Sequence, residues 1–285
     1  MKKILVPTDF SEQADAAVEV ASQLGKKTNA KVTLLHVVEV PHGVSYGSFS
    51  ATGQVAASSD PSDNVFVMEM LKRAKEKMEG LVNEDRFEGV DLHYHIGVGN
   101  PFGQIKDMTH EQEIDLVVIG TKGSTGLSEV LIGSNTEKVV RLSEAPVLSV
   151  KKVVDISSIK KVVFASSLHQ EDANLAKHLK ALVEVLGAEL HLLRVNTPNN
   201  FQSDKTTFKN MEVFKEQFGL TSAKDESYSD AIEEDGIIHY AEMIDADLIA
   251  MATHGRTGFM HLLSGSIAED VVNHAKRPVW TFNVK

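Results

Sequence analysis

The sequence predicts two copies of an α/β domain, each with a doubly wound, mostly parallel sheet. Similar segments recur in the same order: KILVPTD at 3–9 matches KVVFASS at 161–167, and DLVVIGTKG at 115–123 matches DLIAMATHG at 247–255. Apolar runs typical of buried strands alternate with segments of helical periodicity. A duplicated alternation of this kind favours a parallel sheet with helices on both faces. We place the two domains at residues 1–153 and 159–285.

The elements of the first repeat follow from its apolar pattern. Five strands are expected, at residues 4–7, 32–38, 90–97, 116–119 and 147–150. Ser11 is expected to cap a first helix that ends at Gly25. A long amphipathic helix is expected around residues 67–81, a third helix at 102–112 with Pro101 at its start, and a short helix after Ser134.

The first repeat carries extra chain after its second strand. The offset between matching segments falls from 158 residues to 132 beyond this point. Residues 41–62 are rich in Gly, Ser, Ala and Pro and show no periodicity, so they are predicted to form a loop. Gly43, Ser45 and Gly47 spell a serine-hydrolase pattern there, but the tight strand-to-helix turn that this motif needs is not expected.

Composition excludes several classes of function. The chain has 285 residues, a formal charge of −11 and no cysteine, so disulfides and thiolate chemistry are ruled out. The acidic balance argues against a nucleic-acid partner, and no apolar run is long enough for a membrane span. We therefore expect a cytoplasmic protein with neither nucleic acid nor membrane as partner.

A glycine-rich segment follows the fourth expected strand. Gly120, Gly123, Gly133 and Ser134 form the pattern Gly-x2-Gly-x9-Gly-Ser, and its end opens a helix, where free N–H groups and the helix dipole favour an anion. An alternative needs no ligand: Ser134 and Glu137 have the spacing of a helix capping box. The position between a strand and a helix, together with the repeat, favours phosphate binding.

These motifs, with ILVPTDFS at residues 4–11, LLHV at 34–37 and APV at 145–147, resemble the universal stress protein (UspA) family over nearly the whole chain. The resemblance implies five-stranded domains of the Rossmann-like, adenine-nucleotide-hydrolase-like type. It implies ATP as ligand, with or without Mg²⁺, and AMP or ADP as alternatives. The implied ligand contacts are Pro7, Thr8, Asp9, Val37, Ile119, Gly120, Gly123, Gly133, Ser134 and Asn135.

Asp9 has two interpretations. Under the resemblance it holds the ribose or adenine side of the nucleotide, and a short carboxylate at a strand's end suits ribose hydroxyls. Alternatively it is a turn residue that precedes the Ser11 helix cap.

The second repeat departs from the motif at three positions. Ala165, Ser167 and Ala252 stand where the first repeat has Pro7, Asp9 and Gly120. The phosphate half of the motif remains, with Gly255, Gly265 and Ser266 as candidate contacts. The second site is therefore either a partial nucleotide site or a structural copy.

The resemblance also implies a partner for the last strand of each repeat. Exposed sheet edges invite pairing. In a tandem chain, residues 147–150 and 279–284 are expected to pair antiparallel with each other. Whether two chains then form a homodimer stays open.

The preferred function is a nucleotide-binding regulator of the stress response, with no catalytic residues and no metal site. A slow ATPase or phosphotransferase is the first alternative, but phosphoryl transfer needs a group that orients the nucleophile, and none is evident. A scaffold without ligand is the second. His93 and His95 share a strand face but have no further ligand at convincing spacing, so we expect a polar face there.

Overall fold

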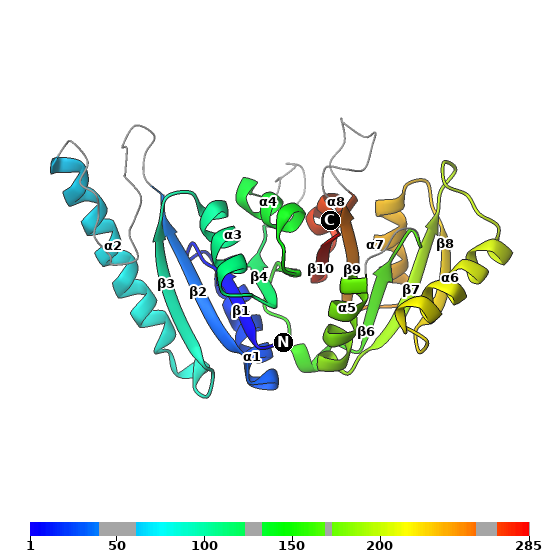
Figure 1. Cartoon of the computed structure of the whole chain (residues 1–285), viewed down its shortest axis with the longest axis horizontal. Helices are drawn as coiled ribbons and strands as arrows, with labels where there is room; N and C mark the ends of the chain where they lie inside the picture. The colour runs from blue at the N-terminus through cyan, green and yellow to red at the C-terminus, as the bar shows by residue number, and fades with distance from the viewer. Residues whose placement is uncertain (40–60, 123–132, 169–172, 255–266, 285) are drawn as a thin grey trace.

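The computed structural model describes residues 1–39, 61–122, 133–168, 173–254 and 267–284 (Figure 1). The strands are β1 (Lys3–Pro7), β2 (Lys31–Val38), β3 (Leu92–Val98), β4 (Leu116–Gly120), β5 (Val147–Val150), β6 (Lys161–Ala165), β7 (Glu189–Asn196), β8 (Lys224–Ser229), β9 (Leu248–His254) and β10 (Val279–Val284). The α-helices are α1 (Glu12–Thr28), α2 (Pro61–Val82), α3 (Pro101–Glu111), α4 (Ser134–Leu142), α5 (Ala173–Leu186), α6 (Asp204–Phe218), α7 (Glu233–Met243) and α8 (Ile267–His274).

Each repeat forms a parallel five-stranded sheet, as predicted. Across the described ranges, the strand order is β3-β2-β1-β4-β5 in the first repeat and β10-β9-β6-β7-β8 in the second. All pairs inside a repeat are parallel. β1 has β2 and β3 on one side and β4 and β5 on the other, and β6 likewise has β7 and β8 on one side and β9 and β10 on the other. Each repeat therefore has a topological switch point beside its first strand. Ligands of open α/β sheets bind at such points, outside the carboxyl ends of the strands.

The two sheets join into one through their last strands. β5 and β10 pair antiparallel, with Val279 opposite Ser149, Trp280 opposite Leu148 and Thr281 opposite Val147. This confirms the predicted internal pairing. Because both strands are paired on both sides, neither remains an exposed edge.

Helices cover both faces of the joined sheet. On one face, α1, α2, α5 and α6 pack on the sheet in a cluster that spans both repeats. On the other face, α3, α4, α7 and α8 pack against the alternate side chains of the same strands. Strand residues therefore divide between the faces with the period of two expected for a β-strand.

One helix end was predicted wrongly. α1 continues past Gly25 to Thr28, and Asn29 ends it in the left-handed conformation, with its N–H bonded to the Gly25 carbonyl. Gly25 serves packing instead, because a Cβ there would lie 2.7 Å from Cγ2 of Val32. Asn tolerates the left-handed region through its short polar side chain, and so replaces glycine as the terminator.

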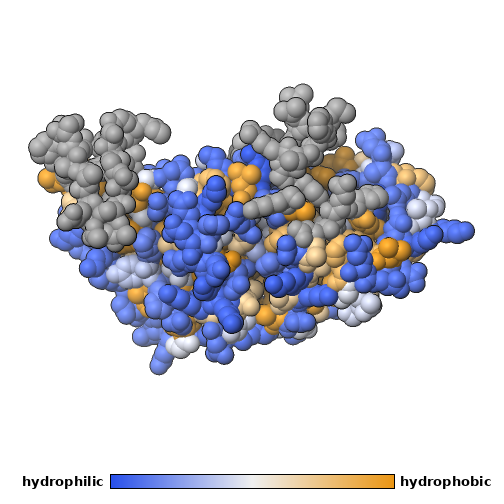
Figure 2. Space-filling view, viewed as in Figure 1, coloured by the Kyte–Doolittle hydropathy of each residue, from blue (hydrophilic) through white to orange (hydrophobic). Residues whose placement is uncertain are grey.

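The face of the molecule in Figure 2 is mostly hydrophilic, with hydrophobic residues in small groups. Among the described residues, no helix is both long enough and apolar enough to cross a membrane. The extra loop predicted at residues 41–62 lies outside the described residues, except that α2 already begins at Pro61.

Candidate functional site

In the first repeat, a tight turn leads from β1 into α1. The Thr8 N–H donates to the Leu35 carbonyl (2.8 Å), and the Thr8 hydroxyl accepts from the N–H of Phe10 (3.1 Å). Phe10 is left-handed, with φ of 64°, which is unusual for a bulky side chain. The Ser11 hydroxyl then caps α1 by accepting from the Ala14 N–H (3.2 Å), as predicted. The turn therefore fixes where Asp9 stands.

Asp9 is exposed at the carboxyl end of β1. One carboxylate oxygen accepts from the Ser11 N–H (2.9 Å), so the predicted turn role is real. Partial burial raises the pKa of Asp9, but the hydrogen bonds from Ser11, with the nearby charge of Lys122, outweigh it and hold the pKa below its usual value. Asp9 is therefore an ionised acceptor at neutral pH, with a lysine close by.

Gly120 is required by packing against α1. A Cβ on Gly120 would lie 2.2 Å from the carbonyl oxygen of Gln13 and 2.7 Å from the backbone nitrogen of Ala14. Its backbone is not left-handed. The backbone of Gly120 therefore makes a close approach to the first turn of α1. This contact places the end of β4 beside the turn that carries Asp9.

The start of α4 bears on the capping-box interpretation of Ser134. Gly133 is the N-cap of α4, and no side-chain hydrogen bond satisfies this cap. Ser134 is the first helical residue and is exposed, and Asn135 follows it half-buried. The predicted capping box is thus not formed, because its serine lies one position too late. The exposed first turn of α4 keeps N–H groups of the kind that bind anions.

The other predicted contacts of the first repeat lie on the α3 and α4 face. Ile119 belongs to the core cluster on that face, and half-buried Val37 packs against it. Pro7 is half-buried at the end of β1. Gly123 lies outside the described residues. The prediction missed His36, whose Nδ1 bonds the Thr8 carbonyl (2.8 Å) and whose ring packs 4.5 Å from that of Phe10.

The second repeat builds the same turn from different residues. The Ser166 N–H donates to the Leu193 carbonyl (3.0 Å), and the Ser166 hydroxyl accepts from the N–H of Leu168 (2.9 Å). Leu168 is left-handed with φ of 63°, as its counterpart Phe10 is. Ser167 is exposed in the place of Asp9. The candidates Gly255, Gly265 and Ser266 lie outside the described residues.

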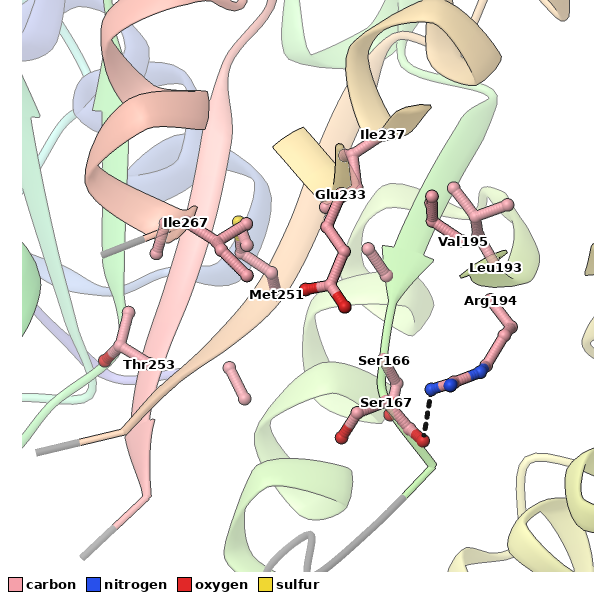
Figure 3. Close-up of a pocket in the computed structure, with 13 residues that line it drawn as sticks. Ser166, Ser167, Leu193, Arg194, Val195, Glu233, Ile237, Met251, Thr253 and Ile267 are labelled. Carbon is pink, nitrogen blue, oxygen red and sulfur yellow. Dashed lines mark hydrogen bonds between the residues drawn. The ribbon is translucent and has the colours of Figure 1, made fainter. Parts of the chain in front are cut away.

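A cavity of about 290 Å³ opens at the carboxyl ends of β6, β7 and β9, at the switch point of the second repeat. Its lining residues are Ala165, Ser166, Ser167, Leu193, Arg194, Val195, Glu233, Ile237, Met251, Ala252, Thr253, Ile267 and Ala268. Figure 3 shows the Glu233 carboxylate pointing toward the space between Met251 of β9 and Ser166, which follows β6. Most of the other lining side chains are apolar.

A charged network forms one wall of this cavity. The Arg194 guanidinium, on a side chain only 4% exposed, donates to the carbonyls of Ser167 (2.8 Å) and Asn200 (3.1 Å). The Asn200 side chain in turn donates to a Glu233 carboxylate oxygen. Burial lowers the pKa of Arg194, and the charge of Glu233 acts in the opposite direction.

The sequence prediction missed this network. Arg194 and Glu233 occupy the positions of His36 and Pro101 in the first repeat. Only this difference in residue type between the repeats could have identified them from the sequence.

The two repeats also meet beside the candidate sites. α4 packs against β9, β10 and α8, and Arg141 of α4 lies 3.8 Å from the Glu269 carboxylate of α8. α8 begins with Ile267 and Ala268, which line the cavity. The helix at the first site therefore contacts the helix that borders the second.

Metal ligation finds no support in the described part of the chain, where no group of three or more acidic or histidine side chains could hold an ion. His93 and His95 are both exposed on one face of β3, and His93 Nε2 bonds the Asp91 carboxylate (2.7 Å). This is the polar strand face that was predicted.

Comparison with known proteins gives one consistent result. The model of the universal stress protein family matches residues 1–151 and 158–283. A universal stress protein of Methanocaldococcus jannaschii is 34% identical over 154 residues, which cover 53% of this chain and 95% of the relative. One of Synechocystis is 22% identical over 291 residues, covering 99% of this chain and all of its own. A solved universal stress protein from Archaeoglobus fulgidus shares the fold, with a TM-score of 0.75, 21% identity and coverage of 99% and 98%.

Proposed function

Because the chain belongs to the universal stress protein family, with two tandem domains, we propose that its first repeat binds an adenine nucleotide and that it acts as a nucleotide-dependent regulator. The observation that carries this proposal is the start of α4. α4 begins at the Gly133–Ser134 end of the glycine motif, and the first-turn N–H groups of a helix favour an anion. The same edge of the sheet presents the ionised carboxylate of Asp9.

The residues of the first repeat suit the two ends of a nucleotide. The Asp9 carboxylate, held in place by Ser11, accepts hydrogen bonds and therefore suits ribose hydroxyls. Gly133, Ser134 and Asn135 at the first turn of α4 would hold phosphate. Half-buried Val37 offers apolar surface for a base. Lys122 places a cation near Asp9 and would balance the charge of an anionic ligand.

We propose binding without efficient turnover. Asp9 is the carboxylate that the turn presents, and its lowered pKa makes it a weak base. Its place at the nucleoside end also separates it from the phosphates. Regulation would then come from ordering of the α4 start when the ligand binds. A cytoplasmic location is part of the same proposal.

The test is to denature freshly purified protein and identify released nucleotide by mass spectrometry, followed by titration with Mg-ATP. We expect about one adenine nucleotide per chain. Ser134→Ala and Asp9→Ala should each weaken binding, whereas Ser203→Ala, which removes the helix cap of α6 in the other repeat, should lower stability and leave affinity unchanged. If the protein neither carries nor binds an adenine nucleotide, the proposal is wrong.

A further inference from the structure

The joined sheet ends on one side at β8, which pairs with β7 and with no other described strand (Figure 1). Its sequence, KDESYS, is polar, and each of its residues is exposed or only half-buried. A strand with one neighbour and little apolar burial gains less from the hydrophobic effect than the central strands do. Side-chain contacts to β7 and α7 therefore matter more for β8 than for the buried strands.

His191 of β7 lies where β7, β8 and α7 meet. Its side chain is only 7% exposed. Its ring nitrogen Nε2 lies 2.6 Å from a carboxylate oxygen of Glu189, on the same strand. The other ring nitrogen, Nδ1, lies 3.4 Å from a carboxylate oxygen of Glu226 on β8 and 3.4 Å from the hydroxyl of Tyr240 on α7. Two carboxylates and one phenol therefore surround a buried imidazole.

Further groups around this ring complete the cluster. Lys224 Nζ lies 2.7 Å from the Glu189 carboxylate, and hydrogen bonds from Lys224 and His191 hold the pKa of Glu189 below its usual value. Burial and the neighbouring carboxylate of β8 raise the pKa of Tyr240, so this phenol keeps its proton. From β6, the register places the uncharged Val163 beside His191. Histidine is the side chain whose charge ordinarily changes between about pH 5 and pH 8, so the charge of this cluster depends on the His191 ring.

The tyrosine hydroxyl allows two arrangements of the same atoms. With both ring nitrogens protonated, Nε2–H donates to Glu189, Nδ1–H faces Glu226, and the Tyr240 O–H is free to donate to Glu226. With Nδ1 unprotonated, that nitrogen becomes an acceptor, and the Tyr240 O–H is the donor within reach. Glu226 then loses both donors. The first arrangement ties β8 to β7 and α7, and the second releases that tie.

We propose that His191 is a pH-sensitive switch, which fastens the edge strand β8 in its doubly protonated form and loosens it in its neutral form. Thr33 holds this position in the first repeat and carries no titrating ring, so the switch belongs to the second repeat. β7 and α7 also line the cavity of that repeat, through Val195 and Glu233. A rise in pH therefore loosens the sheet edge next to this cavity. The switch does not depend on nucleotide binding in the first repeat.

Hydrogen exchange of the full chain, without added nucleotide, tests the proposal. Protection of residues 224–229, corrected for the intrinsic effect of pH, should fall about two- to fivefold from about pH 5.5 to about pH 8, the range of a partly exposed ion pair. Glu226→Gln should remove this fall, because an amide can accept from the protonated ring and donate to the neutral one. His239→Gln is the matched control. His239 is another histidine of α7, its partner is Asp230 just beyond β8 (2.8 Å), and the fall should persist without it.

NMR of the histidine ring nitrogens follows the switch itself in the wild-type chain. We expect both nitrogens of His191 to be protonated at the acid end of this range and only Nε2 at the alkaline end, where Nδ1 accepts from Tyr240. The proposal is wrong if the ring keeps one charge state throughout, or if its neutral form carries the proton on Nδ1. It is equally wrong if protection of residues 224–229 is the same at both pH values, if its fall survives Glu226→Gln, or if His239→Gln abolishes it.

Discussion

The turn after β1 and the turn after β6 follow the same backbone path but present different chemistry. In both, a hydroxyl accepts an N–H two residues on, and that residue is left-handed: Phe10 in one turn and Leu168 in the other. The residue between them is Asp9 in the first repeat and Ser167 in the second. Instead, the second repeat brings a carboxylate from α7, through Glu233. The comparison teaches that the duplicated fold kept its turn geometry while the carboxylate at this edge of the sheet comes from a different element in each repeat.

The largest expected effect concerns the contact between β4 and α1. Gly120→Ala would place a Cβ against the Gln13 backbone, which cannot yield without moving α1. We expect the free energy of unfolding to fall by about 2–3 kcal/mol, as for overpacking in a core. Urea unfolding measures it. The converse change, Ala252→Gly, should cost at most about 1 kcal/mol. If Gly120→Ala and Ala252→Gly lower the free energy of unfolding equally, the two repeats do not differ in packing at this position.

The next effect is on binding. Asp9→Ser gives the first turn the residue of the second and removes the charged acceptor. We expect affinity for Mg-ATP to fall about 10- to 100-fold, since hydrogen bonds to charged groups contribute about 1.5–3 kcal/mol. Equilibrium dialysis with labelled ATP measures it. Ser167→Asp is the control in the other repeat and should leave ATP affinity unchanged. An unchanged affinity for Mg-ATP in Asp9→Ser would show that Asp9 serves only the turn before α1.

A smaller effect is expected from Arg194→His, which gives β7 the residue that β2 carries at this position. Imidazole is too short to reach both carbonyls that Arg194 bonds. We expect a loss of about 1–2 kcal/mol in stability and faster hydrogen exchange in residues 197–203. His36→Ala serves as the comparison in the first repeat, and should leave exchange in residues 197–203 unaffected. Unchanged exchange there in Arg194→His would contradict the role of Arg194 in shaping the cavity.

The last effect concerns the boundary between the repeats and depends on pH. Lys151 follows β5 and donates to the Asn273 carbonyl at the end of α8 (2.6 Å), and burial lowers its pKa from 10.5 to about 8. The unfolded chain therefore binds more protons between these values, and stability rises with pH there. Relative to Lys151→Met, the wild type should gain stability from about pH 8 to pH 10. A flat difference across that window would contradict the burial of this amine.

The fold could be predicted from the sequence because burial on both faces leaves a strong periodic signal. Residues 116–119 are apolar throughout and residues 147–150 are apolar except for Ser149, and the structure buries all of them. The end of α1 was missed because glycine serves both as a helix terminator and as a packing residue, and only the position of Val32 distinguishes the two.

The site was predictable only in part. Asp9 lies in the segment ILVPTDFS and Ser134 in the pattern Gly-x2-Gly-x9-Gly-Ser, so both belong to motifs that are local in the sequence. The structure places Asp9 after β1 and Ser134 at the start of α4. Arg194, Asn200 and Glu233 come from three separate elements, so their network exists only after folding. Their residue types carry no local signal, and Glu233 resembles any acidic residue in the first turn of a helix.

The contact between α4 and α8 has a thermodynamic consequence. α4 begins at the proposed nucleotide site and α8 borders the cavity of the second repeat, and the two helices pack against each other with Arg141 facing Glu269. Ligands at two sites that share one packed boundary are linked when each ligand changes the packing of that boundary. Such linkage is reciprocal: the factor by which a first ligand alters affinity for a second equals the factor in the reverse direction. In the joined sheet, α4 and α8 are in direct contact, so a movement of either helix acts on the packing of the other repeat.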